Sequence, residues 1–153
     1  MLSDDYLKLH QQICHPIYST ANALQRLYKP LLVPLDLTYP QYLIMLALWE
    51  KDSVNLNDIS ERLFFDSGTL TPLIQKLLKK NLIAVKNDEA DRRNKIIVLT
   101  AKGKRLKSAA TAVPRKLSEE IGFSEADINN LMKLVRKLHQ VIIYQEKSKI
   151  SGT

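Results

Sequence analysis

The only cysteine of this 153-residue chain is Cys14, in the stretch "HQQICHPIYST". A thiolate is a nucleophile toward peroxides, and a lone cysteine cannot form a disulfide within its own chain. A single cysteine is also often a small buried apolar residue. A redox role and a structural role for Cys14 therefore both stay open at this point.

The residues around Cys14 do not match a metal site or an enzyme active site. His10 and Cys14 have helical i, i+4 spacing and His15 is adjacent, but no carboxylate or cysteine cluster completes a ligand set, so no metal or cofactor is expected. One-cysteine thiol peroxidases generally show P-x-x-x-T-x-x-C, whereas "LKLHQQI" precedes Cys14 here. Nucleophile-elbow, zinc-protease, P-loop and dinucleotide motifs are also absent, so the sequence predicts a protein that is not an enzyme.

The positive charge of the chain is concentrated in its middle third. The formal net charge is +7, and residues 60–107 alone hold 12 basic and 5 acidic side chains, which accounts for the whole excess. Such a block is expected where one sub-region faces a polyanion, the alternative being a merely solvated basic face.

The apolar spacing predicts a fold that is mainly α with a small β-hairpin. Predicted helices cover about 4–28, 39–50, 57–64, the stretch after Asp66, and the chain after Ala101 with a break at Pro114; predicted strands cover 82–87 and 95–100. Ser3 is a candidate N-cap of the first helix, and Pro16 should kink or restart that helix near Cys14. Ser124 and Asp127 should open the last helix.

Two short helices followed by a basic hairpin are the order of a winged helix-turn-helix, in which a helix enters the major groove and the hairpin reaches phosphates. An amphipathic surface helix is the plainer alternative for the second helix taken alone. Candidate groove contacts are Ser67, Thr69, Thr71, Gln75 and Lys76, and candidate backbone contacts are Lys79, Lys80, Arg92, Arg93 and Lys95.

The run "LFFDSGTLTPLIQKLLKKNLIAVKNDEADRRNKIIVLTAKGK" resembles the recognition helix and wing of MarR-type transcriptional regulators, including a D-x-R at Asp91 and Arg93. "YKPLL" followed by "TYPQYL" resembles the OhrR branch of that family, which senses organic hydroperoxides. The resemblance implies one MarR-type domain over 1–153, with the winged helix at 38–107 and dimerisation helices in 1–37 and 108–153. It also implies a homodimer bound to double-stranded promoter DNA.

The resemblance gives Cys14 the role of redox sensor. Tyr28 and Tyr39 match tyrosines that hydrogen-bond the sensor thiolate, and Tyr18 matches a further tyrosine contributed across the dimer interface. The implied product is a sulfenic acid, which then goes to a mixed disulfide with a low-molecular-weight thiol, a cyclic sulfenamide or over-oxidation. His15 and Pro16 depart from the apolar residues usual after this cysteine, which puts the response threshold in doubt.

The expected protein is therefore a repressor that responds to oxidative stress, releasing promoter DNA when an organic hydroperoxide or another oxidant oxidises Cys14. The alternative is a MarR-type regulator released by a small aromatic ligand, with Cys14 structural. The start "MLSDDYLKLH" does not resemble a signal peptide and no apolar run reaches bilayer length, so a cytoplasmic protein without a membrane partner is expected. A last apolar stripe, which could be core or dimer interface, comprises Ile128, Leu131, Leu134, Val135, Leu138, Val141 and Ile142.

Overall fold

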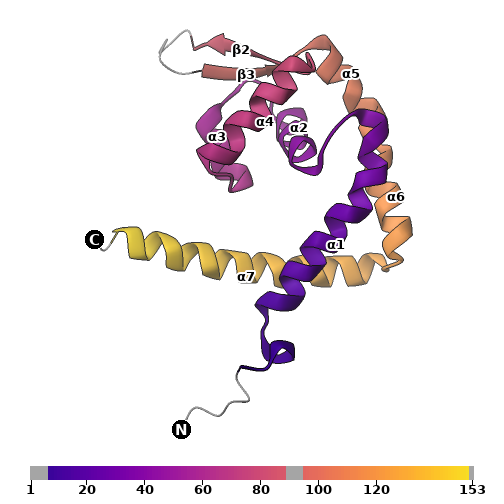
Figure 1. Cartoon of the computed structure of the whole chain (residues 1–153), viewed down its shortest axis with the longest axis vertical. Helices are drawn as coiled ribbons and strands as arrows, with labels where there is room; N and C mark the ends of the chain where they lie inside the picture. Colours follow the sequence, from indigo (N-terminus) through magenta and orange to yellow (C-terminus); the bar gives the residue numbers. More distant parts are fainter. Residues whose placement is uncertain (1–6, 89–94, 152–153) are drawn as a thin grey trace. The chain divides into compact units, whose positions relative to one another are not determined.

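The computed structural model describes residues 7–88 and 95–151, the side chains of the last helix being described as far as Gln145. The chain divides into two compact units, the first ending at Leu117 and the second starting at Ser118. The elements are η2 (Leu9–Gln11), α1 (Cys14–Leu32), η3 (Val33–Leu35), α2 (Tyr39–Glu50), β1 (Val54–Asn55), α3 (Leu56–Leu63), α4 (Ser67–Lys79), β2 (Ile83–Asn87), β3 (Lys95–Leu99), α5 (Ala101–Ala110), α6 (Ala112–Ile121) and α7 (Glu125–Ser151). Figure 1 labels helices α1 to α7 and the strands β2 and β3. The predicted class, mainly helical with a small β-hairpin, is confirmed.

The first helix starts later than predicted. Residues 7–13 form no α-helix, and α1 begins at Cys14 and continues to Leu32. The predicted restart near Cys14 is confirmed, because Pro16 falls in the first turn of α1, where backbone N–H groups have no intrahelical acceptor. The predicted cap Ser3 lies outside the described residues.

Helix α2 is the centre of the core, and its bounds agree with the prediction. Its N-terminus is held by a capping box in which the Thr38 N–H donates to Gln41 Oε1 at 3.1 Å. Tyr42, Ile44 and Leu48 are almost fully buried, and helices α1, α3, α4 and α5 all pack against α2.

No single helix in the described part of the chain is long and apolar enough to cross a membrane. The segments Cys14–Leu35 and Tyr39–Glu50, bent by 68° at their junction, pass such a test only together and only by length and composition. Much of the second segment is buried in the protein core.

Helices α3 and α4 are both fixed by side-chain caps. Asn55 Oδ1 accepts from the Asp58 N–H at 2.8 Å, and Asp66 Oδ1 accepts from the Thr69 N–H at 2.7 Å. The inner face of α4 buries its leucines and isoleucine as the spacing predicted: Leu70, Ile74 and Leu77 are buried, and Leu73 and Leu78 are half-buried. The polar face of α4 is thereby left in solvent.

The sheet has three antiparallel strands in the order β1-β3-β2. The predicted hairpin is present, with Ile83 opposite Leu99 and Asn87 opposite Lys95, and Figure 1 shows it at one edge of the first unit, near α4 and α5. Strand β1 was not predicted. Its two residues pair with β3 through Val54 and Ile97, and two residues are too few to show an alternating pattern.

Helix α5 is locked against the core through Gly103. A Cβ atom at this position would lie 2.1 Å from the backbone oxygen of Leu82, so only glycine allows the approach. The buried Trp49 Nε1–H donates to the Gly103 carbonyl at 2.9 Å. The helical break that was predicted at Pro114 lies instead at Thr111, because a proline in the first turn of α6 is tolerated.

The second unit consists mainly of α7. Ser124 opens it as predicted, its Oγ accepting from the Asp127 N–H at 3.2 Å. The predicted apolar stripe of α7 is not buried within the chain: Leu134 is 66% exposed, Val135 52% and Val141 54%. Of the two roles left open for this stripe, a face for another chain fits its exposure better than a core.

Candidate functional site

Three tyrosines from α1 and α2 form one aromatic cluster. The ring centroids of Tyr28 and Tyr39 are 4.8 Å apart, those of Tyr28 and Tyr42 5.9 Å, and Tyr42 meets Trp49 edge-on at 6.3 Å. Burial, aided by the neighbouring phenols, raises the pKa of Tyr28 to about 12, and burial also raises the pKa of Tyr39 and of Tyr42. These phenols are therefore protonated at neutral pH and can act as hydrogen-bond donors.

Cys14 lies at the other end of α1 from this cluster. Fourteen residues of continuous helix separate it from Tyr28, a rise of about 21 Å. The cysteine is exposed, and Tyr18, one helical turn on along the same face, is 70% exposed. The structure thus brings together Tyr28 with Tyr39, and places Cys14 and Tyr18 on one face, but within one chain it does not bring the thiol to the tyrosine pair.

Two apolar side chains next to the thiol are left uncovered at the start of α1. Ile13 is 67% exposed and Ile17 48% exposed, in the turns that flank Cys14. Exposed aliphatic side chains in adjacent turns are typical of a surface that another molecule covers.

The outward face of α4 carries the predicted groove contacts in a solvent-accessible position. The N-cap Asp66 is itself fully exposed, and hydrogen bonds from the Thr69 N–H and hydroxyl lower its pKa, so it stays charged at the helix N-terminus. The exposed side chains of this face are Ser67, Thr69, Thr71, Gln75, Lys76 and Lys79.

The remaining predicted DNA contacts divide into three cases. Lys95 is exposed on β3, and its ammonium donates to Asn87 Oδ1 at 2.7 Å across the hairpin. Lys80 is only 24% exposed, and its ammonium donates to Asp36 and Gln41. Asp91, Arg92 and Arg93 lie outside the described residues.

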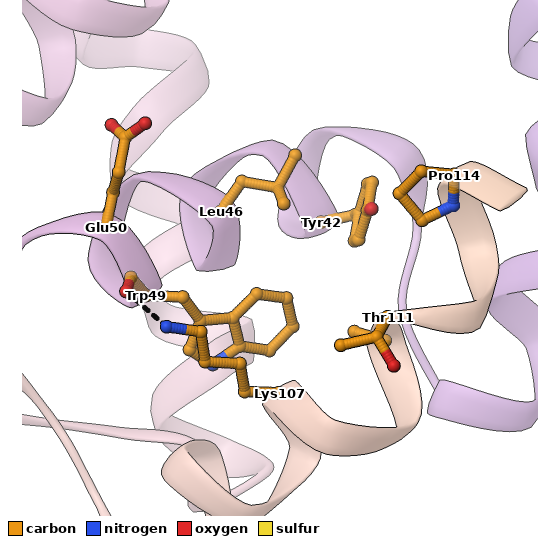
Figure 2. A pocket seen from close by; sticks show the side chains of 8 residues that line it. Tyr42, Leu46, Trp49, Glu50, Lys107, Thr111 and Pro114 are labelled. Atoms are coloured by element: carbon orange, nitrogen blue, oxygen red, sulfur yellow. Dashed lines mark hydrogen bonds between the residues drawn. The ribbon is translucent and has the colours of Figure 1, made fainter.

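An apolar cavity of about 420 Å³ opens between α2 and the α5–α6 segment (Figure 2). Figure 2 shows Leu46 and Tyr42 facing Thr111 and Lys107 across it, and the Lys107 ammonium donates to the Trp49 carbonyl at 2.9 Å. Sequence reasoning missed this cavity, because its walls come from helices far apart in the chain and no motif marks them. Its lining comprises Tyr42, Leu46, Trp49, Glu50, Lys107, Ala110, Thr111 and Pro114.

Metal ligands do not gather in the described part of the chain. Over residues 7–88 and 95–151, no group of three His, Cys, Asp or Glu side chains lies close enough together to hold an ion.

Comparison with known sequences finds transcriptional regulators. The family model "Transcriptional regulator SarA/Rot" matches residues 26–110. The organic hydroperoxide resistance transcriptional regulator of Bacillus subtilis is 36% identical over 138 residues, covering 90% of this chain and 92% of the relative. The HTH-type transcriptional regulator SarZ of Staphylococcus aureus is 37% identical over 133 residues, covering 84% of this chain and 90% of the relative.

Comparison with solved structures finds AbfR of Staphylococcus epidermidis. Reduced AbfR bound to DNA is 27% identical, with a TM-score of 0.74, and the match covers 90% of this chain and 97% of that chain. AbfR has also been solved overoxidised on DNA and in a disulfide form. MarR of Escherichia coli, 21% identical with a TM-score of 0.69 over 83% of this chain and 96% of that one, shares the fold.

Proposed function

This chain belongs to the MarR-type transcriptional regulators, in the group that the SarA/Rot model describes, and from that membership we propose that it regulates transcription by binding promoter DNA and releasing it when Cys14 is oxidised. The oxidant we propose is an organic hydroperoxide, the compound named for the Bacillus subtilis relative. The relatives' names favour this redox response over release by a small aromatic ligand.

The observation that carries the proposal is the separation of Cys14 from Tyr28 along α1, about 21 Å, together with the exposure of the thiol. A thiol that is to be hydrogen-bonded by Tyr28 and Tyr39 must meet them in a second chain. Two α1 helices packed antiparallel about a two-fold axis would place the Cys14 end of each beside the tyrosine end of the other.

The uncovered apolar surfaces support such a homodimer. Ile13 and Ile17 flank the thiol on α1, and the stripe containing Leu134 and Val135 runs along α7. Each of these faces leaves aliphatic side chains in water within one chain, and covering them with a second copy would remove that cost. The dimer would also supply two recognition helices for two half-sites.

The chemistry at the thiol follows from the groups that the dimer would bring together. Phenolic O–H groups of Tyr28 and Tyr39 donate to a Cys14 thiolate and stabilise its charge. The thiolate attacks the terminal oxygen of R–O–O–H, the S–O bond forms as the O–O bond breaks, and the alkoxide leaves and takes a proton from water. The cysteine, now a sulfenic acid, has been oxidised by two electrons and the peroxide reduced to an alcohol.

DNA binding is proposed for the exposed face of α4 and for the hairpin. Ser67, Thr69 and Gln75 present short or planar polar groups to the major groove, and Lys76, Lys79 and Lys95 present cations to phosphates. The basic block of residues 60–107 agrees with this placement.

Fluorescence anisotropy of a labelled palindromic promoter fragment from upstream of the protein's own gene, at fixed salt, tests the proposal. Binding should be lost after cumene hydroperoxide and recovered after dithiothreitol, and the matched Cys14→Ser variant should bind DNA and ignore the peroxide. Equal loss of DNA binding in Cys14→Ser would refute Cys14 as the sensor, and a parent protein that ignores peroxide would refute the redox response.

A further inference from the structure

The side chain of Lys80 is only 24% exposed, and three acceptors hold its ammonium against the protein surface. The ammonium donates to the backbone carbonyl and to Oδ1 of Asp36, the latter at 3.1 Å, and to Gln41 Oε1 at 3.2 Å. A lysine ammonium has three N–H donors, so these three acceptors saturate it. The neighbouring Lys79 differs, because its side chain is exposed on the surface of α4.

The two acceptor residues flank the start of α2, Asp36 in the turn before it and Gln41 in its first turn. Gln41 is 2% exposed, and its Oε1 also accepts from the Thr38 N–H, the capping contact that begins α2 one residue before Tyr39. Asp36 has a left-handed backbone with φ of 52° and occupies the turn between α1 and α2. The position of the Lys80 ammonium is therefore fixed by the segment that carries Tyr39.

The backbone of Lys80 is fixed just as firmly at the other end. Lys80 is the C-cap of α4, and its carbonyl accepts from the Lys102 ammonium of α5 at 2.9 Å. The next carbonyl, that of Asn81, accepts from the Thr100 hydroxyl at 2.7 Å. The side chain of Lys80 thus joins the end of α4 to Asp36, 44 residues earlier in the sequence, and to Gln41 in the first turn of α2.

We propose that Lys80 is a positioning residue that sets the placement of the recognition helix α4 from the start of α2, rather than a contact to a DNA phosphate. The inference rests on the proposed function, since it gives the route by which a change at Tyr39 reaches the DNA-facing helix. When oxidation of Cys14 displaces Tyr39, the Thr38–Gln41 cap moves, and Lys80 carries that movement to the end of α4.

The test compares Lys80→Met with the adjacent Lys79→Met by DNA anisotropy over a series of salt concentrations, before and after cumene hydroperoxide. Methionine keeps the apolar stem of lysine and lacks the ammonium. Lys80→Met should bind DNA about tenfold more weakly with an unchanged salt slope. Lys79→Met, in contrast, should flatten the slope of log K against log salt by about 0.9 for each phosphate that the lysine neutralises in the parent.

Asp36→Asn gives a second, independent variant that leaves every lysine in place. Asparagine tolerates the left-handed backbone, and the exchange removes the carboxylate charge that holds Lys80. A positioning role predicts weaker DNA binding in Asp36→Asn, whereas a phosphate contact predicts equal or tighter binding because the ammonium is released. If Lys80→Met shows no cooperative unfolding, and so is not folded, the DNA affinity of Asp36→Asn alone decides between the two roles of Lys80.

The redox response separates positioning from general loss of stability. The ratio of DNA affinities before and after peroxide should shrink in Lys80→Met and stay at the parent value in Lys79→Met. Two results would overturn the inference. One is a salt slope that flattens in Lys80→Met as it does in Lys79→Met, and the other is a Lys80→Met protein whose DNA affinity and redox ratio equal those of the parent. If the parent itself ignores peroxide, the proposed redox function fails, while the affinities and slopes of the reduced proteins still decide on Lys80.

Discussion

The rings of Tyr28 and Tyr39 lie 4.8 Å apart although the residues belong to different helices. The pair joins the end of α1 to the first turn of α2, and both phenols have a pKa raised by burial. Two protonated phenols are thus packed together where the proposed thiolate of a second chain would need hydrogen-bond donors.

Removal of one donor should slow the redox response. Tyr39→Phe keeps the ring and removes the hydroxyl, so DNA release after a fixed dose of cumene hydroperoxide should be slower by about tenfold, the worth of a hydrogen bond to a charged group. Stopped-flow anisotropy measures the rate. The matched control is Tyr42→Phe, which removes a phenol of the same cluster that the proposed site does not use; equal slowing in both variants would contradict the assignment.

The raised pKa of Tyr28 predicts a loss of stability in alkali. A folded-state pKa of about 12 against 10.0 for a free phenol means that the folded chain holds its proton more tightly than the unfolded chain. The stabilisation is complete below pH 10 and is lost as the pH rises toward 12. Urea unfolding at pH 9, 10 and 11 should show this decline in the parent and a smaller one in Tyr28→Phe, and parallel declines would count against it.

Asp52 predicts the opposite behaviour in acid. Desolvation opposes ionisation, but hydrogen bonds from the Leu99 and Ser53 N–H groups, each 2.8 Å long, and from Lys104 prevail and lower the pKa of this carboxyl. Its contribution is present above about pH 4 and is lost as the pH falls through the lowered pKa. Asp52→Asn should therefore lower the Tm at pH 7, and its difference from the parent should shrink as the pH falls below about 4. Glu61→Gln, an exposed control, should leave the Tm unchanged at pH 7.

Gly103→Ala should destabilise the fold although alanine is the better helix former. The added Cβ would meet the Leu82 carbonyl oxygen at 2.1 Å, and that oxygen belongs to backbone that cannot turn aside. We expect a loss of about 1–3 kcal/mol or more in the free energy of unfolding. Chemical denaturation checks this, with the exposed Ser108→Ala of the same helix as control; a stabilised Gly103→Ala protein would show that the approach of α5 is looser than described.

The exposed stripe of α7 predicts how the dimer can be broken. Leu134→Glu puts a charge on a side chain that is 66% exposed in one chain and that the proposed dimer would bury. Sedimentation equilibrium should show monomer at concentrations where the parent is dimeric. Gln140→Glu makes the same change of charge outside the predicted apolar stripe and should leave the dimer intact; a dimeric Leu134→Glu protein would exclude this stripe from the interface.

Local signals in the sequence were sufficient for most helices and for the hairpin. The Thr38–Gln41 capping box placed α2 correctly, and Asp66 placed the start of α4, because caps are decided by residues within one turn. The D-x-R of the wing falls at residues 91–93, outside the described residues, and its role stays a prediction.

Contacts between distant segments could not be read from the sequence. The β1 pairing joins Val54 to Ile97, and Lys80 meets Asp36 across 44 residues, so neither leaves a periodic pattern. From the sequence, Lys80 could not be distinguished from the other lysines of this basic helix. Only the structure shows that its ammonium has three acceptors within the chain. The sequence predicted a helix around Cys14 and Tyr28 but also a kink near Cys14, so it did not fix the distance between the two residues. Because α1 is unbroken from Cys14 to Leu32, the distance is about 21 Å, too long for a contact within one chain.

The length of α1 also determines how two defective chains behave when they are mixed. One chain carries Cys14→Ser with its tyrosines intact, and the other keeps Cys14 but carries Tyr28→Phe and Tyr39→Phe. In the proposed antiparallel dimer, each homodimer would lack a complete site, whereas the heterodimer would regain one, because the thiol of the second chain would face the phenols of the first. Co-expressed in one cell, two insensitive alleles would complement each other, and a single allele would be partly dominant over the wild type.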